Sequence, residues 1–361
     1  MRRASVLGIP NERFAAGAIA EGYRRELAAA QLRFLADRGH DPLRPWQPGF
    51  DLLAVSGGGE DAAFGAGVLT AWRERPEFQV VTDVSTAAST APFAFLGPAW
   101  DGGLEEVYTR ITPRDLAIRG PWTTALFDDA LAETAPLFRT ISRHLDERML
   151  EEIASAYRRR RLLLIGTTNL DAGVPVIWNV GAIAASGHPR ALETVRKVLL
   201  ASASLPGVFP PVLFDVTVDG RVHPELYVDG GRWRSCSSTP PPSGPTAAPP
   251  SPPTAPSCPP RTGHPQRTPR SQLDGDGSPY VDHGAACPQH PVGGVGLRRH
   301  EARVAGDARD EVEFRLADIG EGVTETDEEP FDPASMRALF GHAQRRTREG
   351  NVWMAHPPGL G

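Results

Sequence analysis

The sequence predicts an α/β fold in which a mainly parallel sheet is covered by helices on both faces. Residues 51–231 contain three apolar runs of strand length, at Leu52–Val55, Phe78–Val84 and Leu162–Thr167. Helical patterns lie between these runs, at Leu104–Ile111 and Asp146–Arg160. Strands that alternate with helices favour a parallel sheet, because each parallel pair needs a long crossover connection.

Composition limits the class of protein. The chain has 361 residues, of which 40% are hydrophobic and 23% charged, enough for one large core or two modest ones. A net charge of -6 gives no basic field, so we expect no nucleic-acid partner. No apolar run is long enough for a membrane span, and the N-terminal residues do not form a signal peptide. These observations favour a cytoplasmic protein, or a true start further upstream.

The chain divides into four segments. Residues 1–50 form a helical lead-in with a helix expected at Glu21–Arg38, and residues 51–231 form the core. Residues 232–311 are Pro-rich, and residues 312–361 carry a C-terminal helix that packs on the core. Asp332 and Pro333 predict the start of that helix, and Gly350 predicts its end after Arg348.

The Pro-rich segment differs sharply from its surroundings. From Pro240 to Pro291 there are 16 prolines in 52 residues, with too little apolar content to offset ordering entropy, which predicts disorder. We interpret this segment as out-of-frame translation of GC-rich DNA, and a natural linker is the alternative. Resequencing that found one continuous frame would contradict our interpretation. The three cysteines lie here at spacings that fit neither a zinc site nor a disulfide framework (Cys236, Cys258 and Cys287).

Three motifs in the core carry candidate chemistry. The first motif, Gly57, Gly58 and Gly59, follows a strand and precedes a helix. Converging backbone N–H groups at this position suit an anion, and a simple tight turn is the alternative. Ser85 follows the strand that ends at Val84, as a nucleophile at a strand-to-helix turn would, although a helix-capping serine also fits. Asp229 precedes two glycines, where it either points into a cleft or belongs to a common turn.

Taken together, the order and spacing of these motifs resemble those of patatin-like acyl hydrolases of a bacterial subgroup. Ser85 lies 27 residues after Gly58, and Asp229 lies 144 residues after Ser85. Four further blocks are similar to that family, namely Pro92–Gly97, Gly166–Asp171, Ala203–Pro211 and Glu329–Pro333. The resemblance covers residues 51–231 and, more faintly, 1–50 and 312–361.

The resemblance implies a three-layer α/β/α sandwich and the hydrolysis of lipid acyl esters, with contact to a membrane surface possible. Carried over residue by residue, Ser85 is the nucleophile, Asp229 is its base, and Gly57, Gly58 and Gly59 form the oxyanion hole. A carboxylate with a raised pKa can accept a serine proton without a histidine. No metal and no cofactor are required.

Several positions depart from the family pattern. Asp83 and Ala87 replace the two glycines that usually flank the nucleophile, and Ala62 replaces the glycine after the loop. Asp83 would add bulk and negative charge beside the oxyanion. Residues 232–311 replace an expected strand and helix of the sheet. These departures support an alternative in which the chain is an inactive relative that only folds or binds lipid.

Two further interpretations of the motifs stay open. Gly57-x-Gly59-x-x-Ala62 with Asp83 at the end of the next strand is formally a dinucleotide-binding fingerprint. A Ser-His-Asp triad would need a histidine after the acid, and the candidates lie in the Pro-rich segment (His264, His283, His290 and His300). His188, before Pro189, is typical of a loop residue.

Overall fold

The computed structural model describes residues 4–15, 19–37, 49–110, 135–206, 209–230, 294–301, 311–320 and 331–354. The three cysteines and His264, His283 and His290 lie outside these residues. The first half of the described chain contains β1 (Ala4–Val6), β2 (Arg13–Ala15), α1 (Ile19–Asp37), β3 (Gly49–Val55), η1 (Gly59–Asp61), α2 (Ala62–Ala71), β4 (Val80–Val84), η2 (Ser85–Ser89), α3 (Ala91–Leu96), η3 (Pro98–Trp100) and α4 (Asp101–Arg110).

The second half contains α7 (Ala135–His144), α8 (Glu147–Arg158), β5 (Leu162–Asn169), β6 (Val174–Asn179), α9 (Val180–Ala184), α10 (Ala191–Ala203), β7 (Val212–Val218), β8 (Arg221–Asp229), β9 (Gly294–Glu301), β10 (Glu311–Asp318), α11 (Pro333–Glu349) and β11 (Trp353–Met354). Among the helices described, none combines the length and the apolar content needed to cross a bilayer.

The described strands form one sheet in the order β1-β7-β8-β5-β4-β3-β9-β10-β11, with β6 joined to β5 and β2 joined to β6. The α/β class is confirmed, but the prediction of a mainly parallel sheet is wrong. Only β3–β4 and β4–β5 pair in parallel, and the other described pairs are antiparallel. The strand and helix alternation therefore describes the centre of the sheet and fails at its flanks.

Short connections explain two of the antiparallel pairs, β7–β8 and β5–β6, because two strands joined by a tight turn can pair only in opposite directions. Between β7 and β8 the turn consists of Asp219 and Gly220, both with positive φ (51° and 79°), which is the backbone of a two-residue hairpin turn. Between β5 and β6 the connection is similarly short, residues 170–173.

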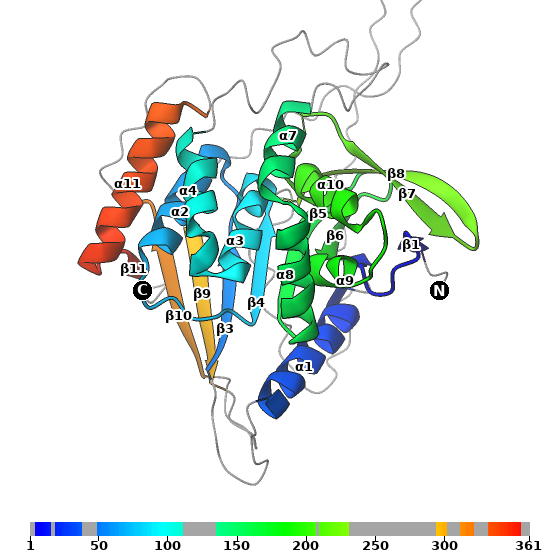
Figure 1. Cartoon of the computed structure of the whole chain (residues 1–361), viewed down its shortest axis with the longest axis horizontal. Helices are drawn as coiled ribbons and strands as arrows, with labels where there is room; N and C mark the ends of the chain where they lie inside the picture. The colour runs from blue at the N-terminus through cyan, green and yellow to red at the C-terminus, as the bar shows by residue number, and fades with distance from the viewer. Residues whose placement is uncertain are drawn as a thin grey trace, which may run out of the picture. The chain divides into compact units, whose positions relative to one another are not determined.

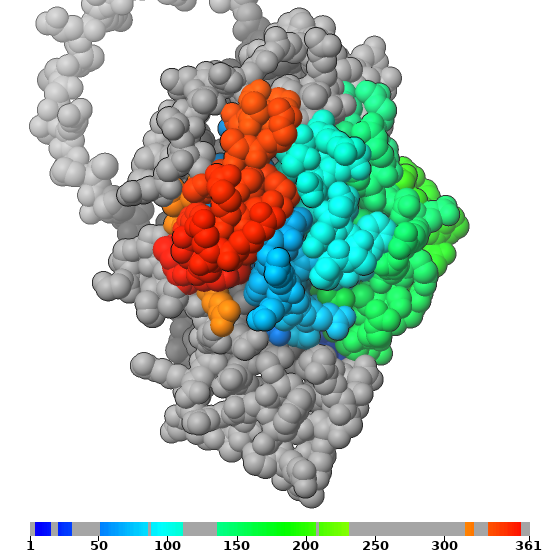
Figure 2. Space-filling view, turned by 60° about the vertical axis from the view of Figure 1, so that its left-hand side comes forward, coloured from blue at the N-terminus to red at the C-terminus, as the bar shows by residue number. Residues whose placement is uncertain are grey.

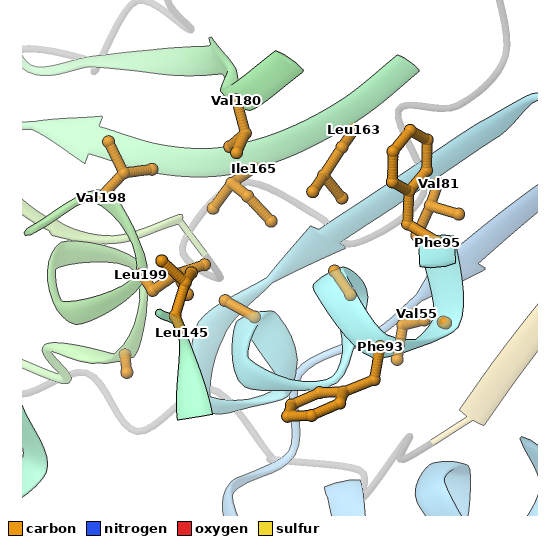
Figure 3. Close-up of a cluster of buried hydrophobic side chains, with 14 of the residues drawn as sticks. Val55, Val81, Phe93, Phe95, Leu145, Leu163, Ile165, Val180, Val198 and Leu199 are labelled. Atoms are coloured by element: carbon orange, nitrogen blue, oxygen red, sulfur yellow. The ribbon is translucent and has the colours of Figure 1, made fainter. Parts of the chain in front are cut away.

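Helices lie on both faces of the parallel centre (Figure 1). On one face, Tyr23 and Ala30 of α1 pack with side chains from β3, β4 and β5. On the other, the strands meet a larger group of helices that includes α2, α3, α8 and α10. Figure 3 shows part of this core, where strand side chains face those of the helices, among them Val55, Val81, Leu163, Ile165, Phe93, Phe95, Val198 and Leu199.

Strand β9 lies within residues 232–311, just after the stretch from Pro240 to Pro291 that composition predicts to be disordered. It pairs with β3 on one side and with β10 on the other, both antiparallel, so this part of residues 232–311 does contribute to the sheet. The expectation that a sheet strand is missing here is corrected. Only Val295 and Leu297 carry a strand-like alternation in the sequence, and glycines and arginines surround them, so the signal is weak.

Helix α11 matches the expected C-terminal helix closely. Asp332 caps its start, with Oδ2 accepting the Ser335 N–H at 2.8 Å, and Gly350 follows its end in a left-handed conformation. Met336, Leu339, Phe340 and Ala343 are buried in the core. Figure 2 shows α11 lying beside α2 and α4 at the surface.

Candidate active site

Ser85 occupies a strained turn at the end of the central strand β4. Its φ is 71°, in the left-handed region that a non-glycine residue rarely adopts, and it is the first residue of the helical turn η2, directly after β4. The serine side chain of a sharp strand-to-helix turn is displayed at the end of the sheet. The structure therefore gives Ser85 the backbone geometry expected of a nucleophile elbow, although both flanking glycines are replaced.

Asp229 lies at the end of β8 and meets Ser85 directly. Ser85 Oγ donates a hydrogen bond of 2.6 Å to Asp229 Oδ2, and the two residues are exposed by only 5% and 2%. Asp229 pairs with Thr167 of β5, the strand that lies between β8 and β4, and its N–H donates to the Ser204 carbonyl at 3.0 Å. Two residues separated by 144 positions are thus brought into hydrogen-bond contact through the β5 strand.

Glycine is required at two places around this pair. A Cβ on Gly57 would lie 2.9 Å from Ser85 Oγ and would overlap the Ser85 Cβ. A Cβ on Gly230 would lie 2.8 Å from the Gly166 carbonyl carbon and from a Val84 methyl. Gly57, the first residue of the glycine loop (Gly57, Gly58 and Gly59), and Gly230 can therefore approach the serine turn only because they lack side chains.

Gly58 and Gly59 make different contacts from Gly57. Gly58 is exposed, and its carbonyl accepts the Asp61 N–H at 3.0 Å as the helical turn η1 begins. Gly59 has φ of 62° and lines an apolar pocket. Of the three predicted oxyanion residues, the structure brings Gly57 against Ser85 and Gly59 to the pocket.

Ser202 forms hydrogen bonds that hold the serine turn in place, and its role was not predicted from the sequence. Its Oγ accepts the Ser85 N–H at 3.0 Å and donates to the Gly166 carbonyl at 2.8 Å. It belongs to α10 and is fully buried. Its position just before the Ala203–Pro211 block is the one signal that could have identified it.

Asp83 is the main chemical departure beside the site. It is 4% exposed, Oδ1 accepts the Val84 N–H at 2.6 Å, and Oδ2 has no hydrogen-bond partner among the described residues. Burial raises the pKa of this carboxyl well above its ordinary value of 3.8, and the nearby Asp229 charge raises the pKa further. The N–H groups of Val84 and Ala91 oppose this shift. Asp83 therefore keeps its proton to a higher pH than an exposed aspartic acid does.

An apolar pocket of about 60 Å³ adjoins the site. Ser85 and Asp229 are not among its lining residues, but Gly59 of the glycine loop, Ser89 of η2 and Ala203 of α10 are. Most of the remaining lining is apolar, and it comes from several helices and from two residues outside them, Phe209 and Phe331 (the helical residues are Phe93, Val107, Leu137, Ile141, Met149, Leu199 and Met336). Mostly apolar concavities with few polar groups suit a hydrocarbon chain.

The dinucleotide site and the triad find less support in the geometry. A dinucleotide-binding loop would use Asp83 at a ribose hydroxyl, but Asp83 is buried and bonded to its own turn. His188 lies in the loop before α10, where Nδ1 accepts the Arg190 N–H at 3.1 Å. His300 lies in β9.

Comparison with known families decides between these interpretations. A family model described as patatin-like phospholipase matches residues 53–241, which is more than half of the chain. The chain belongs to the patatin-like phospholipase family. Among curated proteins, none matches it significantly.

The patatin-like phospholipase family is a family of lipid acyl hydrolases, and the chain shares its core. The matched residues include the glycine loop, Ser85, Asp83 and Asp229, so the departures at Asp83 and Ala87 lie inside a recognisable patatin-like core. Strands β9 and β10 and helix α11 lie beyond the match.

Proposed function

We propose that this chain hydrolyses acyl esters of lipids, with Ser85 as the nucleophile and Asp229 as its base. The observation that carries the proposal is the 2.6 Å hydrogen bond from Ser85 Oγ to Asp229 Oδ2 at a left-handed serine turn. A serine hydroxyl attacks an ester only if a base accepts its proton, and Asp229 is placed to do so.

The reaction proceeds in two steps that share one base. Ser85 Oγ bonds to the ester carbonyl carbon while Asp229 takes the hydroxyl proton, and the carbonyl oxygen becomes an oxyanion. The carbon–oxygen bond to the alcohol then breaks, and Asp229 returns the proton to the leaving alkoxide. Water, deprotonated by Asp229, attacks the acyl-serine, and the fatty acid leaves as Ser85 regains its proton.

Backbone N–H groups around Gly57, Gly58 and Gly59 are the proposed oxyanion donors. The close approach of Gly57 to Ser85 supports this role, because donors must lie near the carbon that Ser85 attacks. A well-placed donor of this kind contributes about 3–4 kcal/mol to stabilisation of the transition state. The adjoining apolar pocket is the proposed site of the acyl chain.

The test is hydrolysis of p-nitrophenyl butyrate by the full chain. We expect Ser85→Ala and Asp229→Asn each to lower kcat by at least ~1,000-fold, because either change removes the activated nucleophile. Ser155→Ala is the matched control. Ser155 lies in α8, and its hydroxyl accepts a hydrogen bond from Arg159, the residue that follows this helix. Activity that survives Ser85→Ala would rule out Ser85 as the nucleophile.

A second candidate function is lipid binding without turnover, which the buried carboxyl of Asp83 beside Asp229 favours. Wild-type protein that unfolds cooperatively and binds a fatty acid in calorimetry, but forms no acyl-serine detectable by mass spectrometry, would support this function.

Contact with a membrane surface is a further proposal. Leu213 and Val222, exposed by 48% and 63%, provide apolar side chains for it on β7 and β8.

A further inference from the structure

The wall of the apolar pocket includes a part of the chain that the family match does not cover. Phe331 and Met336 line the pocket together with Gly59, whereas the match ends at residue 241. Met336 is buried in the core through α11, and Phe331 precedes that helix as a partly buried residue packed on the core. This wall therefore comes from the C-terminal segment, beyond the residues that the family match covers.

Phe331 is tied to the glycine loop. Its N–H donates to Glu60 Oε2 at 2.8 Å, and its ring atom Cζ lies 3.9 Å from the position of a Cβ on Gly59. Its φ is 63°, a conformation that a bulky residue adopts only when its surroundings hold it there. The Glu60 carboxylate on one side and the Asp332-capped start of α11 on the other hold this backbone in place.

We propose that Phe331 is a specificity-determining residue that limits the length of the acyl chain bound beside Ser85. This inference rests on the proposed hydrolase function. The ring fills apolar space at the glycine-loop end of the pocket, so a longer chain must compete with it. The substrate class is therefore an acyl ester whose chain is short enough to lie beside the Phe331 ring.

The experiment compares kcat/KM for p-nitrophenyl butyrate, hexanoate, octanoate and decanoate in the wild type, Phe331→Ala and Phe331→Leu. We expect the wild type to prefer butyrate or hexanoate. Phe331→Ala should raise the ratio of decanoate to butyrate by at least ~10-fold, the discrimination given by about two more buried methylenes. Phe331→Leu, which keeps apolar bulk, should give a smaller rise.

Phe138→Ala is the control for general loosening, because Phe138 is a partly buried aromatic residue of α7 that does not line the pocket. An unchanged ratio in Phe331→Ala, or an equal rise in Phe138→Ala, would overturn the proposal while Ser85-dependent activity still upheld the hydrolase function.

If Ser85-dependent activity is absent, the hydrolase proposal fails, and the pocket is then tested by binding alone. Calorimetric titration with butyrate and decanoate would use the Ser85→Ala protein with and without Phe331→Ala. The limit on chain length predicts that decanoate affinity rises in Phe331→Ala and butyrate affinity does not. Equal affinities in the two proteins would refute the limit.

Discussion

At the residue scale, Asp83 sets a pH dependence. Its pKa is raised in the folded chain, so the folded state holds a proton that the unfolded chain loses near pH 3.8. The free energy of unfolding therefore falls as pH rises from that value through the folded pKa. Asp83→Asn mimics the protonated carboxyl and keeps an acceptor for the Val84 N–H. We expect this variant to be more stable than the wild type at pH 7, in urea unfolding, with the difference vanishing toward pH 4.

The same substitution has an expected kinetic result. Ionisation of Asp83 adds a negative charge near Asp229 and the developing oxyanion, which opposes attack by Ser85. Ester hydrolysis by the wild type should therefore decline at high pH, and Asp83→Asn should remove that decline. Identical pH profiles for the two proteins would show that Asp83 does not titrate in the folded chain.

Ser202 supports the serine turn through a single hydroxyl. Ser202→Ala leaves the Ser85 N–H and the Gly166 carbonyl without this partner, so we expect a loss of ~1–3 kcal/mol in unfolding free energy and a fall in kcat. Thr194→Ala is the control, because Thr194 is a buried residue of the same helix α10 and its hydroxyl donates to the Arg190 carbonyl at 2.8 Å. Equal kcat values in the two variants would contradict a positioning role for Ser202.

At the scale of elements, α2 and α11 pack closely at Gly67. A Cβ there would lie 2.8 Å from the Ala343 Cβ and would clash with the Phe340 carbonyl oxygen. We expect Gly67→Ala to destabilise the fold by ~1–3 kcal/mol, because backbone of α11 must shift.

Gly102→Ala provides the comparison for Gly67→Ala. Gly102 lies in α4, and a Cβ there meets nothing within 4 Å, so the change should be neutral or up to ~1 kcal/mol stabilising. Thermal unfolding of both variants tests the contact. Similar melting temperatures would show that α11 does not pack on α2 in this way.

At the scale of the whole molecule, sequence patterns predict the centre of the sheet and the candidate site better than the periphery. The runs at β3, β4 and β5 and the motifs at Ser85 and Asp229 carry local signals, and the structure places them together. The sheet flanks were missed, although Asp219-Gly220 is a strong hairpin signature.

Other features have no local signal at all. The contact between Phe331 and the glycine loop joins residues that lie 271 positions apart, and Ser202 reaches Ser85 across 117 positions. Such contacts depend on how helices pack, which periodicity does not report. Strand β9 is similar, because its place beside β3 is fixed by pairing rather than by its own composition.

The order of the strands in the sheet also affects the chain while it is being synthesised. Strand β3 pairs with β9, which is synthesised more than 230 residues later. Ser85 and Asp229 have both been synthesised before β9. Until β9 is made, the N–H and C=O groups on one side of β3 have no strand to pair with. An open strand edge in a nascent chain invites pairing with neighbouring polypeptides. Chaperone demand and losses to inclusion bodies should therefore depend on how soon the residues of β9 arrive, more than on the chemistry at Ser85.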